Sequence, residues 1–357
     1  MTRRHDIDNL RFSMILLLFP FHAAMVFDGG EFGGFFVWLH KNPFLHAFVT
    51  FTFPWFMSLL FVLAGISAHY SLRKRGTRGF LSERMKKLLV PLLLGLIFLV
   101  PVQSYIADLF WNNYSGTYWS HLSIFFTKNT YFTGYDGSFT PSHLWFILYL
   151  FLYSFILIPL KTVYCRLSRF TNRLRISYPI LLLLFLPEYL FLPLLNILSK
   201  SVGQYLFLFL CGYFILYHEK ACSETENFRF ISLCLFLLSG AVYTFLWCRY
   251  SYMGAWMPIL YVFFGWTGIL SILGYASRYF RRRTPLTAVL SEAAFSLYLL
   301  HMPVEVVLAY FWVKLPLSDL ILFLLITFSS LGVTLLLYLI NKTVRQIFLY
   351  RVHKQEN

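Results

Sequence analysis

The chain has 357 residues, of which 59% are apolar and only 13% are charged, and its mean hydropathy is +0.66. This composition excludes a soluble globular protein and a disordered one, and it indicates an integral membrane protein. The net charge of +15 does not predict a nucleic-acid partner, because basic residues gather beside anionic lipids on the cytoplasmic side of a membrane.

The apolar runs predict an all-α polytopic membrane protein with about ten transmembrane helices, since a helix needs about 20 apolar residues to cross a bilayer. The expected spans are residues 10–27, 45–71, 86–106, 143–160, 177–195, 203–217, 229–248, 256–274, 288–312 and 318–341. Most basic residues then fall on one side, and the positive-inside rule places that side, with both termini, in the cytoplasm. No linker or repeat interrupts the pattern, so we expect a single membrane domain over residues 1–357.

The first expected span contains two residues that are costly in a bilayer, Arg11 and His22, in the stretch LRFSMILLLFPFH. An α-helix rises about 1.5 Å per residue, so roughly 16 Å separate them, about half the thickness of the bilayer core. We therefore expect Arg11 at the membrane surface and His22 near the middle. Ionisable groups at that depth usually mark a functional site, although a histidine that only packs against its neighbours is the alternative.

Basic residues also mark the cytoplasmic end of the third expected span, where RMKKLLVP places Arg84 and Lys87 about one helical turn apart. Such residues are typical of a positive-inside flank. The alternative is a site for phosphate groups, which clustered cations attract and hold.

The longest connection, residues 107–142, is rich in aromatic residues and leads into His143 of the stretch HLWFIL. Its aromatic residues are Trp111, Tyr114, Tyr118, Trp119, Tyr131, Phe132 and Tyr135. They are typical of an interfacial belt. The alternative is a platform for sugar rings, because Tyr and Trp combine an apolar face with a polar tip.

The ninth expected span contains His301 and Glu305 in SLYLLHMPVEVV. His301 lies about 20 Å from the cytoplasmic start of its span, so we expect it at the level of His22. Residues four apart share a helix face, which would let Glu305 orient and charge the imidazole, although Pro303 lies between them. The histidine and cysteine spacings fit no metal motif, so we expect no metal.

These landmarks together resemble the acyltransferase-3 family of membrane O-acyltransferases, and most closely its glucan biosynthesis protein C (OpgC-type) subgroup. The resemblance extends over residues 10–303 and rests on Arg11 with His22, LLFVLAGIS, Arg84-x-x-Lys87 before Pro91, HLWFIL, and SLYLLHMP. In the family's FFxxSGF element, Ala64 and Ile66 replace the usual serine and aromatic residue. The additional extracytoplasmic domain of some relatives is absent from this sequence.

The resemblance implies an acyl-CoA-dependent O-acyltransferase of the bacterial cytoplasmic (inner) membrane. Its substrates would be a cytoplasmic acyl-CoA, carrying a succinyl or acetyl group, and a hydroxyl of an extracytoplasmic glycan such as a periplasmic glucan or a surface polysaccharide. Lipids would surround it, and the sequence leaves homo-oligomerisation open. A glycan exporter, a proton-coupled transporter and a scaffold subunit of an envelope system are the alternatives.

The resemblance also implies roles for ten residues of this sequence. Arg11, Arg84 and Lys87 would bind the phosphates of CoA. His22 would remove the acceptor proton or carry the acyl group, while His301, tuned by Glu305, would hold the acceptor or stabilise the oxyanion. The residues expected to line the acceptor side are His143, Trp145, Ser296 and Tyr298.

Overall fold

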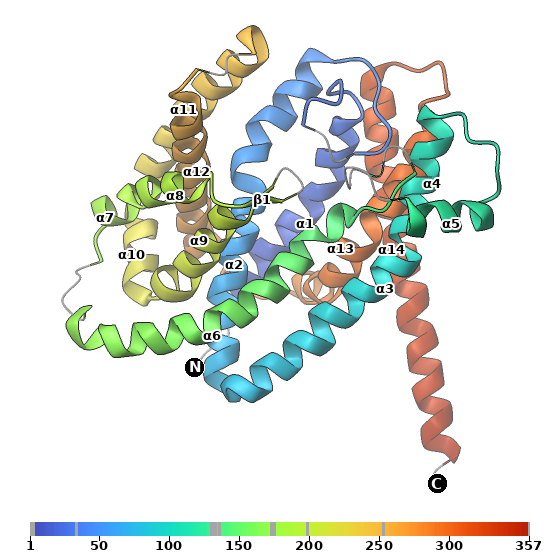
Figure 1. Ribbon diagram of the computed structural model, residues 1–357. Coiled ribbons are helices and arrows are strands. Elements are labelled where there is room, and N and C mark those ends of the chain that lie inside the picture. The colour runs from blue at the N-terminus through green and yellow to red at the C-terminus, as the bar shows by residue number, and fades with distance from the viewer. Residues whose placement is uncertain are drawn as a thin grey trace. The chain divides into compact units, whose positions relative to one another are not determined.

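The computed structural model describes residues 4–32, 35–128, 134, 137–171, 176–197, 200–251 and 254–355, and these are mainly helical (Figure 1). The α-helices are α1 (His5–Met25), α2 (Pro43–Arg84), α3 (Val90–Phe98), α4 (Val100–Trp111), α5 (Tyr118–Thr127), α6 (Trp145–Thr171), α7 (Tyr178–Leu183), α8 (Phe185–Phe191), α9 (Val202–Cys211), α10 (Glu219–Asn227), α11 (Arg229–Tyr250), α12 (Met257–Tyr279), α13 (Pro285–Trp312) and α14 (Asp319–Gln355). The short helices are the π-helices η1 (Met85–Leu89) and η3 (Gly212–Leu216) and the 3₁₀-helix η2 (Ser142–Leu144). Strands β1 (Asn196–Ile197) and β2 (Lys200–Ser201) pair antiparallel.

Six segments of the described chain are long and apolar enough to cross a membrane. They are Pro43–Trp111, Ser142–Tyr164, Arg229–Tyr250, Met257–Tyr279, Thr287–Trp312 and Asp319–Gln346. The all-α, multi-span class is therefore confirmed, whereas the number of ten spans and the cytoplasmic placement of both termini stay predictions. Two of the expected spans correspond to the shorter apolar helices Tyr178–Phe191 and Val202–Leu216. The first of these is broken into α7 and α8 just before Pro187, whose ring removes a backbone donor.

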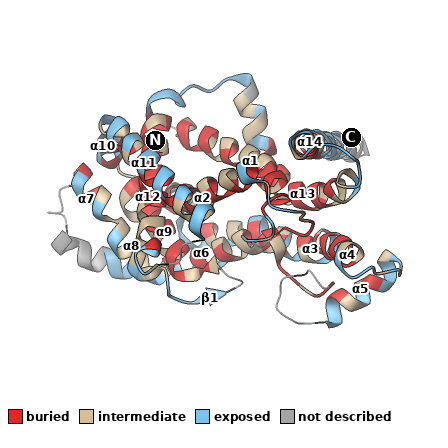
Figure 2. Ribbon diagram, turned by 90° about the horizontal axis from the view of Figure 1, so that it is seen from above, coloured by how far each residue is buried: buried red, intermediate tan, exposed pale blue. Residues whose placement is uncertain are grey.

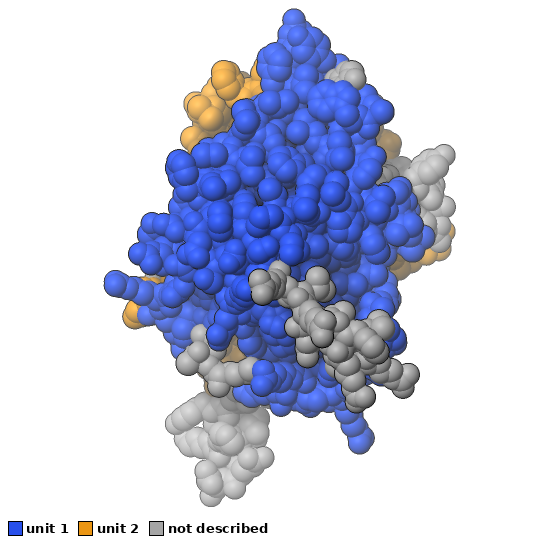
Figure 3. Space-filling model, turned by 90° about the vertical axis from the view of Figure 1, so that its left-hand side faces the viewer, with its two compact units in different colours: residues 1–11, 46–96, 143–283 blue, residues 12–45, 97–142, 284–357 orange. Residues whose placement is uncertain are grey.

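The residues group into two compact units, which Figure 3 shows in different colours. Unit 1 contains residues 1–11, 46–96 and 143–283, and unit 2 contains residues 12–45, 97–142 and 284–357. The expectation of a single domain over residues 1–357 stays a prediction. In unit 2 the buried residues of α13 follow one side of the helix, whereas α14 is exposed along much of its length (Figure 2). In unit 1, α12 is buried on all sides over residues 264–271.

The exposed surfaces carry many large apolar side chains, as expected of helices that face lipid. Phe230 and Leu238 on α11 are each 68% exposed, and Phe328 on α14 is 66% exposed. Such surfaces are unfavourable in water, and association between helices in lipid depends instead on close packing and hydrogen bonds. These helices therefore satisfy the expectation of a membrane protein from their surface as well as from their length.

Close helix packing is most evident in unit 1, where α2 crosses α9 and η3. A Cβ atom added to Gly65 of α2 would overlap the carbonyl oxygen of Phe209, and one added to Gly212 would overlap the carbonyl oxygen of Val62. Glycine is therefore required on both sides of this crossing, because small residues let helix backbones touch.

In unit 2, α13 packs against α4 and α14. The connection before α2 is fixed to α4 by aromatic contacts: the indole N–H of Trp111 donates to the carbonyl oxygen of Phe36 at 3.0 Å, and its ring lies 4.1 Å from that of Trp38. Unit 2 thus has a helical core with an aromatic connection attached to it.

Candidate functional site

The residues predicted from the sequence divide between the two units, so each group is described within its own unit. Unit 2 contains His22, Ser296, Tyr298, His301 and Glu305. Unit 1 contains Arg11, Arg84, Lys87, His143 and Trp145.

In unit 2 the structure brings His22 of α1 and His301 of α13 together. Their rings stack, with centroids 5.4 Å apart and an interplanar angle of 29°. His301 is completely buried, whereas His22 is half-buried. The equal depth expected for the two imidazoles from helix rise alone is consistent with this contact.

Aromatic side chains surround the histidine pair. The ring of Phe35 stacks on His22 at 5.8 Å and 22°, and Phe21 meets the same imidazole edge-on at 5.3 Å. Phe19 packs edge-on against His301 at 6.0 Å. Packing on several sides restricts the rotamers of both rings, and a low local dielectric strengthens any charge interaction that they make.

His301 is oriented by its own helix. Its Nδ1 lies 2.6 Å from the carbonyl oxygen of Tyr298, one turn earlier on α13. A carbonyl only accepts hydrogen bonds, so Nδ1 carries the proton in the neutral ring and Nε2 has the lone pair. The imidazole is therefore held in one tautomer.

The expected contact between His301 and Glu305 is wrong. Both carboxyl oxygens of Glu305 are buried and form no hydrogen bond within the described part of the chain, and the group lies near the backbone of Ala23. The imidazole of His301 instead uses its Nδ1 to bond the carbonyl oxygen of Tyr298, one turn earlier on the helix. Spacing placed the two residues on one face but did not give their directions.

Of the other residues expected on α13, only Tyr298 lies beside the imidazole pair. Its ring is buried, with its centroid 5.8 Å from that of His301. Ser296 is five residues before His301, which is about 140° around an α-helix, so it lies on a different face. Its predicted role in lining the acceptor side is not supported by a contact with this pair.

In unit 1 the structure places two of the predicted donor-binding cations near each other. Arg11 donates to the hydroxyl of Ser67 on α2 and lies 3.5 Å from a carboxylate oxygen of Asp8. The guanidinium of Arg84 lies 4.6 Å above the ring of Phe80, within range of electrostatic repulsion by Arg11. Arg84 forms no ion pair with a described residue, and its buried Nε has no hydrogen-bond partner among them. The carboxylates of Asp8 and Glu83 offset part of this positive charge, and the two guanidiniums together are suited to an anion.

Lys87 does not join Arg11 and Arg84. Its ammonium donates to Glu83 at 2.8 Å, and its side chain is 68% exposed. Lys87 lies in π-helix η1, which has a wider turn than an α-helix, so residues three apart no longer share a face. The predicted spacing assumed a regular α-helix and therefore misplaced this residue.

The other predicted residues of unit 1 lie at the start of α6. His143 is buried in η2, and Trp145 is half-buried against Tyr149 and Tyr205, with ring centroids 5.3 and 5.2 Å away. Lys200 was not among the residues predicted from the sequence, and its ammonium lies 5.8 Å from the centre of the Trp145 ring. Its only sequence signal is a basic residue between two apolar helices.

Parts of the aromatic connection are also placed in unit 2. Tyr105 and Tyr114 pack edge-on around His121, whose Nε2 lies 3.5 Å from Asp108. Tyr131, Phe132 and Tyr135, which belong to the predicted platform for sugar rings, lie outside the described residues. The choice between an interfacial belt and a sugar platform therefore stays a prediction.

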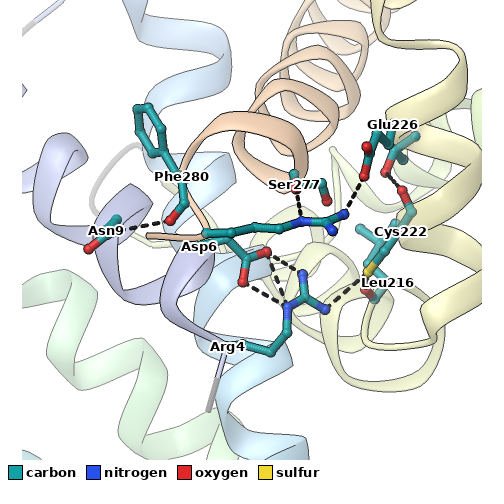
Figure 4. A network of polar contacts seen from close by, with 10 residues as sticks. Arg4, Asp6, Asn9, Leu216, Cys222, Glu226, Ser277 and Phe280 are labelled. Atoms are coloured by element: carbon teal, nitrogen blue, oxygen red, sulfur yellow. Dashed lines mark hydrogen bonds and ion pairs between the residues drawn. The ribbon is translucent and has the colours of Figure 1, made fainter. Parts of the chain in front are cut away.

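Unit 1 also contains a polar cavity of about 510 Å³. Its cations are already neutralised: Arg4 binds Asp6 with a 2.8 Å hydrogen bond, and Arg281 pairs with Glu226 at 2.5 Å (Figure 4). Arg4 also donates to the sulfur of Cys222 at 3.1 Å. This network binds α1 to α10 and α12 and leaves little net charge for an anion.

Within the described residues, no group of three or more His, Cys, Asp or Glu side chains is arranged to hold a metal ion. Comparison with curated proteins and with solved structures finds no match to this chain. A family model described as an acyltransferase domain matches residues 4–339, which is nearly the whole chain. The protein therefore belongs to the acyltransferase-3 family, whose members are membrane acyltransferases.

Proposed function

We propose that this protein transfers an acyl group, succinyl or acetyl, from cytoplasmic acyl-CoA to a hydroxyl of an extracytoplasmic glycan, in the bacterial cytoplasmic membrane. The observation that carries the proposal is the stacked pair His22 and His301 between α1 and α13. An alcohol is a weak nucleophile, and a positioned general base contributes about 10²–10⁴-fold to such a reaction. The glucan subgroup remains a proposal that rests on the sequence resemblance.

His22 is the proposed base, because it is the more exposed member of the pair. The acceptor hydroxyl gives its proton to His22 while its oxygen bonds to the thioester carbonyl carbon. The carbon–sulfur bond then breaks, and the CoA sulfur takes the proton from His22. The positive charge that His22 carries between these steps faces the stacked ring of Phe35, which stabilises a cation by about 0.5–2 kcal/mol.

His301 supports this step as a neutral ring. Donation from its Nδ1 to the Tyr298 carbonyl fixes the tautomer, and a second cation stacked on protonated His22 would repel it. Glu305 has no step in this scheme.

Arg11 and Arg84 are the proposed ligands of the CoA phosphates. Their mutual repulsion is relieved when an anion binds, and Ser67 fixes the direction of Arg11. Helix α1 carries both Arg11 and His22, about 16 Å apart along its axis.

The test is acyl transfer by the purified full-length protein in lipid vesicles, measured as CoA thiol release and as label transferred to added glucan. We expect His22→Asn to lower kcat by about 10²–10⁴-fold with little change in KM. His40→Asn is the matched control, because His40 is an exposed histidine that pairs with Asp319. Normal turnover by His22→Asn would refute the catalytic role, and glycan export without thiol release would favour transport.

Donor binding is tested with the same assay. We expect Arg84→Gln and Arg11→Gln to raise KM for acyl-CoA by about ten-fold or more, since each removes a charge-assisted contact. Lys86→Gln is the control, because Lys86 is an exposed cation of the same segment. Equal KM values for Arg84→Gln and Lys86→Gln would exclude Arg84 from the donor site.

A further inference from the structure

A lysine and two aromatic rings form a partly exposed patch in unit 1. The ammonium of Lys200 lies 4.9 Å from the ring centre of Phe53 and 5.8 Å from that of Trp145. The three side chains come from β2, α2 and α6, and each is half-buried. We call these three residues the Lys200 patch.

The patch rests on a layer of buried aromatic side chains. Beneath Trp145, the rings of Phe61 and Tyr205 stack with centroids 4.6 Å apart, and Tyr149 is 1% exposed. The Tyr149 hydroxyl contacts the carbonyl oxygens of Ile197 and Lys200 at 3.1 and 3.2 Å. The backbone at Lys200 is therefore fixed by α6, and the patch is held in place before any ligand arrives.

The charge of Lys200 is not neutralised by the described residues. No carboxylate among them forms an ion pair with Lys200, and the contacts of its ammonium are with ring faces. A ring face attracts a cation but leaves its full charge. Lys41 and Lys87 pair with carboxylates, while Lys314, which also lies over an aromatic ring, is exposed to solvent. Lys200 differs from them because it is half-buried without a counter-ion.

We propose that the Lys200 patch binds an anionic group of a substrate of the acyl-transfer reaction. The ammonium of Lys200 contacts a carboxylate or phosphate, and the face of Trp145 contacts an apolar ring face. This inference rests on the proposed acyl transfer to a glycan. The shared chemistry is one negative charge beside an apolar surface, because a tryptophan face suits a sugar ring and a lysine suits an anion. Two substrate parts carry it: an acidic sugar of the acceptor, and the free carboxylate of a dicarboxylic acyl group.

The proposal makes Lys200 a determinant of substrate choice and leaves the chemical step to the histidine pair. Replacing the charge should therefore weaken the binding of anionic substrates and leave the turnover of neutral ones unchanged. An interaction of this kind, between charged groups in a partly buried position, is lost by truncation of either partner. Arginine keeps the charge and the planar contact with aromatic rings, so it should preserve binding.

The test measures binding of small probes to the purified full-length protein by saturation-transfer NMR, independently of acyl transfer. The probes are glucuronate, glucose and succinate, and the variants are Lys200→Met, Lys200→Arg and the control Lys314→Met. We expect Lys200→Met to weaken glucuronate or succinate binding at least about ten-fold, with no effect of Lys314→Met. If the binding of glucuronate depends on Lys200, the ligand of the patch is an acidic sugar of the acceptor. If the binding of succinate depends on Lys200, the ligand is the free carboxylate of the acyl group.

Two results would overturn the proposal. The first is that Lys200→Met leaves the binding of the anionic probes unchanged. The second is that the wild-type protein binds glucuronate, succinate and glucose with equal affinity, and this comparison requires no variant. A failure of the proposed acyl transfer is recognised by a different result: no CoA thiol is released from acetyl-CoA when a neutral glucan is the acceptor. The binding assay does not depend on that reaction.

Discussion

The crossing of α2 with α9 allows a sharp prediction, because backbone meets backbone at Gly65. A Cβ at this position would lie 2.9 Å from the backbone nitrogen of Tyr213 and 3.0 Å from the carbonyl carbon of Phe209, besides overlapping the Phe209 oxygen. Carbon atoms in favourable contact are about 3.5–4.0 Å apart. Backbone atoms cannot rotate away as a side chain can, so Gly65→Ala must push the two helices apart.

The expected cost combines two opposing effects. Overpacking a tight contact costs about 1–3 kcal/mol, and the rigid obstacle places Gly65→Ala at the upper end. Alanine in a helix is favoured over glycine by about 1 kcal/mol. The net loss in the free energy of unfolding is therefore about 2 kcal/mol, which corresponds to a fall in Tm of about 3 °C for a chain of 357 residues.

The assay is thermal unfolding of the purified protein in detergent, followed by tryptophan fluorescence. The matched control is Gly332→Ala in α14, because a Cβ there meets no atom within 4 Å. Only the helix preference then remains, and Tm should stay equal or rise. If Gly65→Ala and Gly332→Ala had the same Tm, α2 and α9 would not be in contact at Gly65 and the reasoning would be refuted.

Three further predictions use the same thermal assay. Burial raises the pKa of Asp28 to about 6, although hydrogen bonds from two backbone amides act in the opposite direction. The folded state then binds more protons than the unfolded state, so the free energy of unfolding of the wild type rises by up to roughly 3 kcal/mol as the pH falls from 6 to 4, and this gain is lost as the pH rises. Parallel pH profiles of wild type and Asp28→Asn would contradict this prediction. Glu188→Ala should cost about 2–4 kcal/mol, since it removes the acceptor of Gln204, 2.9 Å away in the core, and equal losses for Glu188→Gln would show that this hydrogen bond is unimportant. Trp266→Phe should cost about 2 kcal/mol, because the buried indole donates to the carbonyl oxygen of Leu181 at 2.8 Å; an unchanged Tm would refute it.

Features that depend on one helix at a time could be predicted from the sequence. The hydropathy indicated the membrane class, and the regular rise of an α-helix placed His22 and His301 at similar depths, where the structure shows their rings stacked. Depth is a property of each helix alone. Which helices are neighbours depends on the whole fold, and only the likeness to family motifs indicated that the helices of His22 and His301 belong to one site.

Features that depend on side-chain direction or on irregular helices could not be predicted in this way. The spacing of His301 and Glu305 gave a shared face, yet His301 bonds the backbone carbonyl of Tyr298 and not the carboxyl group of Glu305. The spacing of Arg84 and Lys87 assumed 3.6 residues per turn, and π-helix η1 breaks that assumption without a signal in the sequence. Lys200 meets Phe53 and Trp145 through contacts between distant segments, which no local pattern reveals.

Counting basic residues would have favoured a different anion site from the one that we propose. The polar cavity of unit 1 contains Arg4 and Arg281, but Asp6 and Glu226 already neutralise them (Figure 4). Arg84 has no ion-pair partner among the described residues and is approached by a second cation, Arg11. An incoming phosphate would have to displace a carboxylate in the cavity, whereas it would relieve repulsion beside Arg84. The proposed donor site is therefore beside Arg84, which forms no ion pair with a described residue, rather than in this polar cavity.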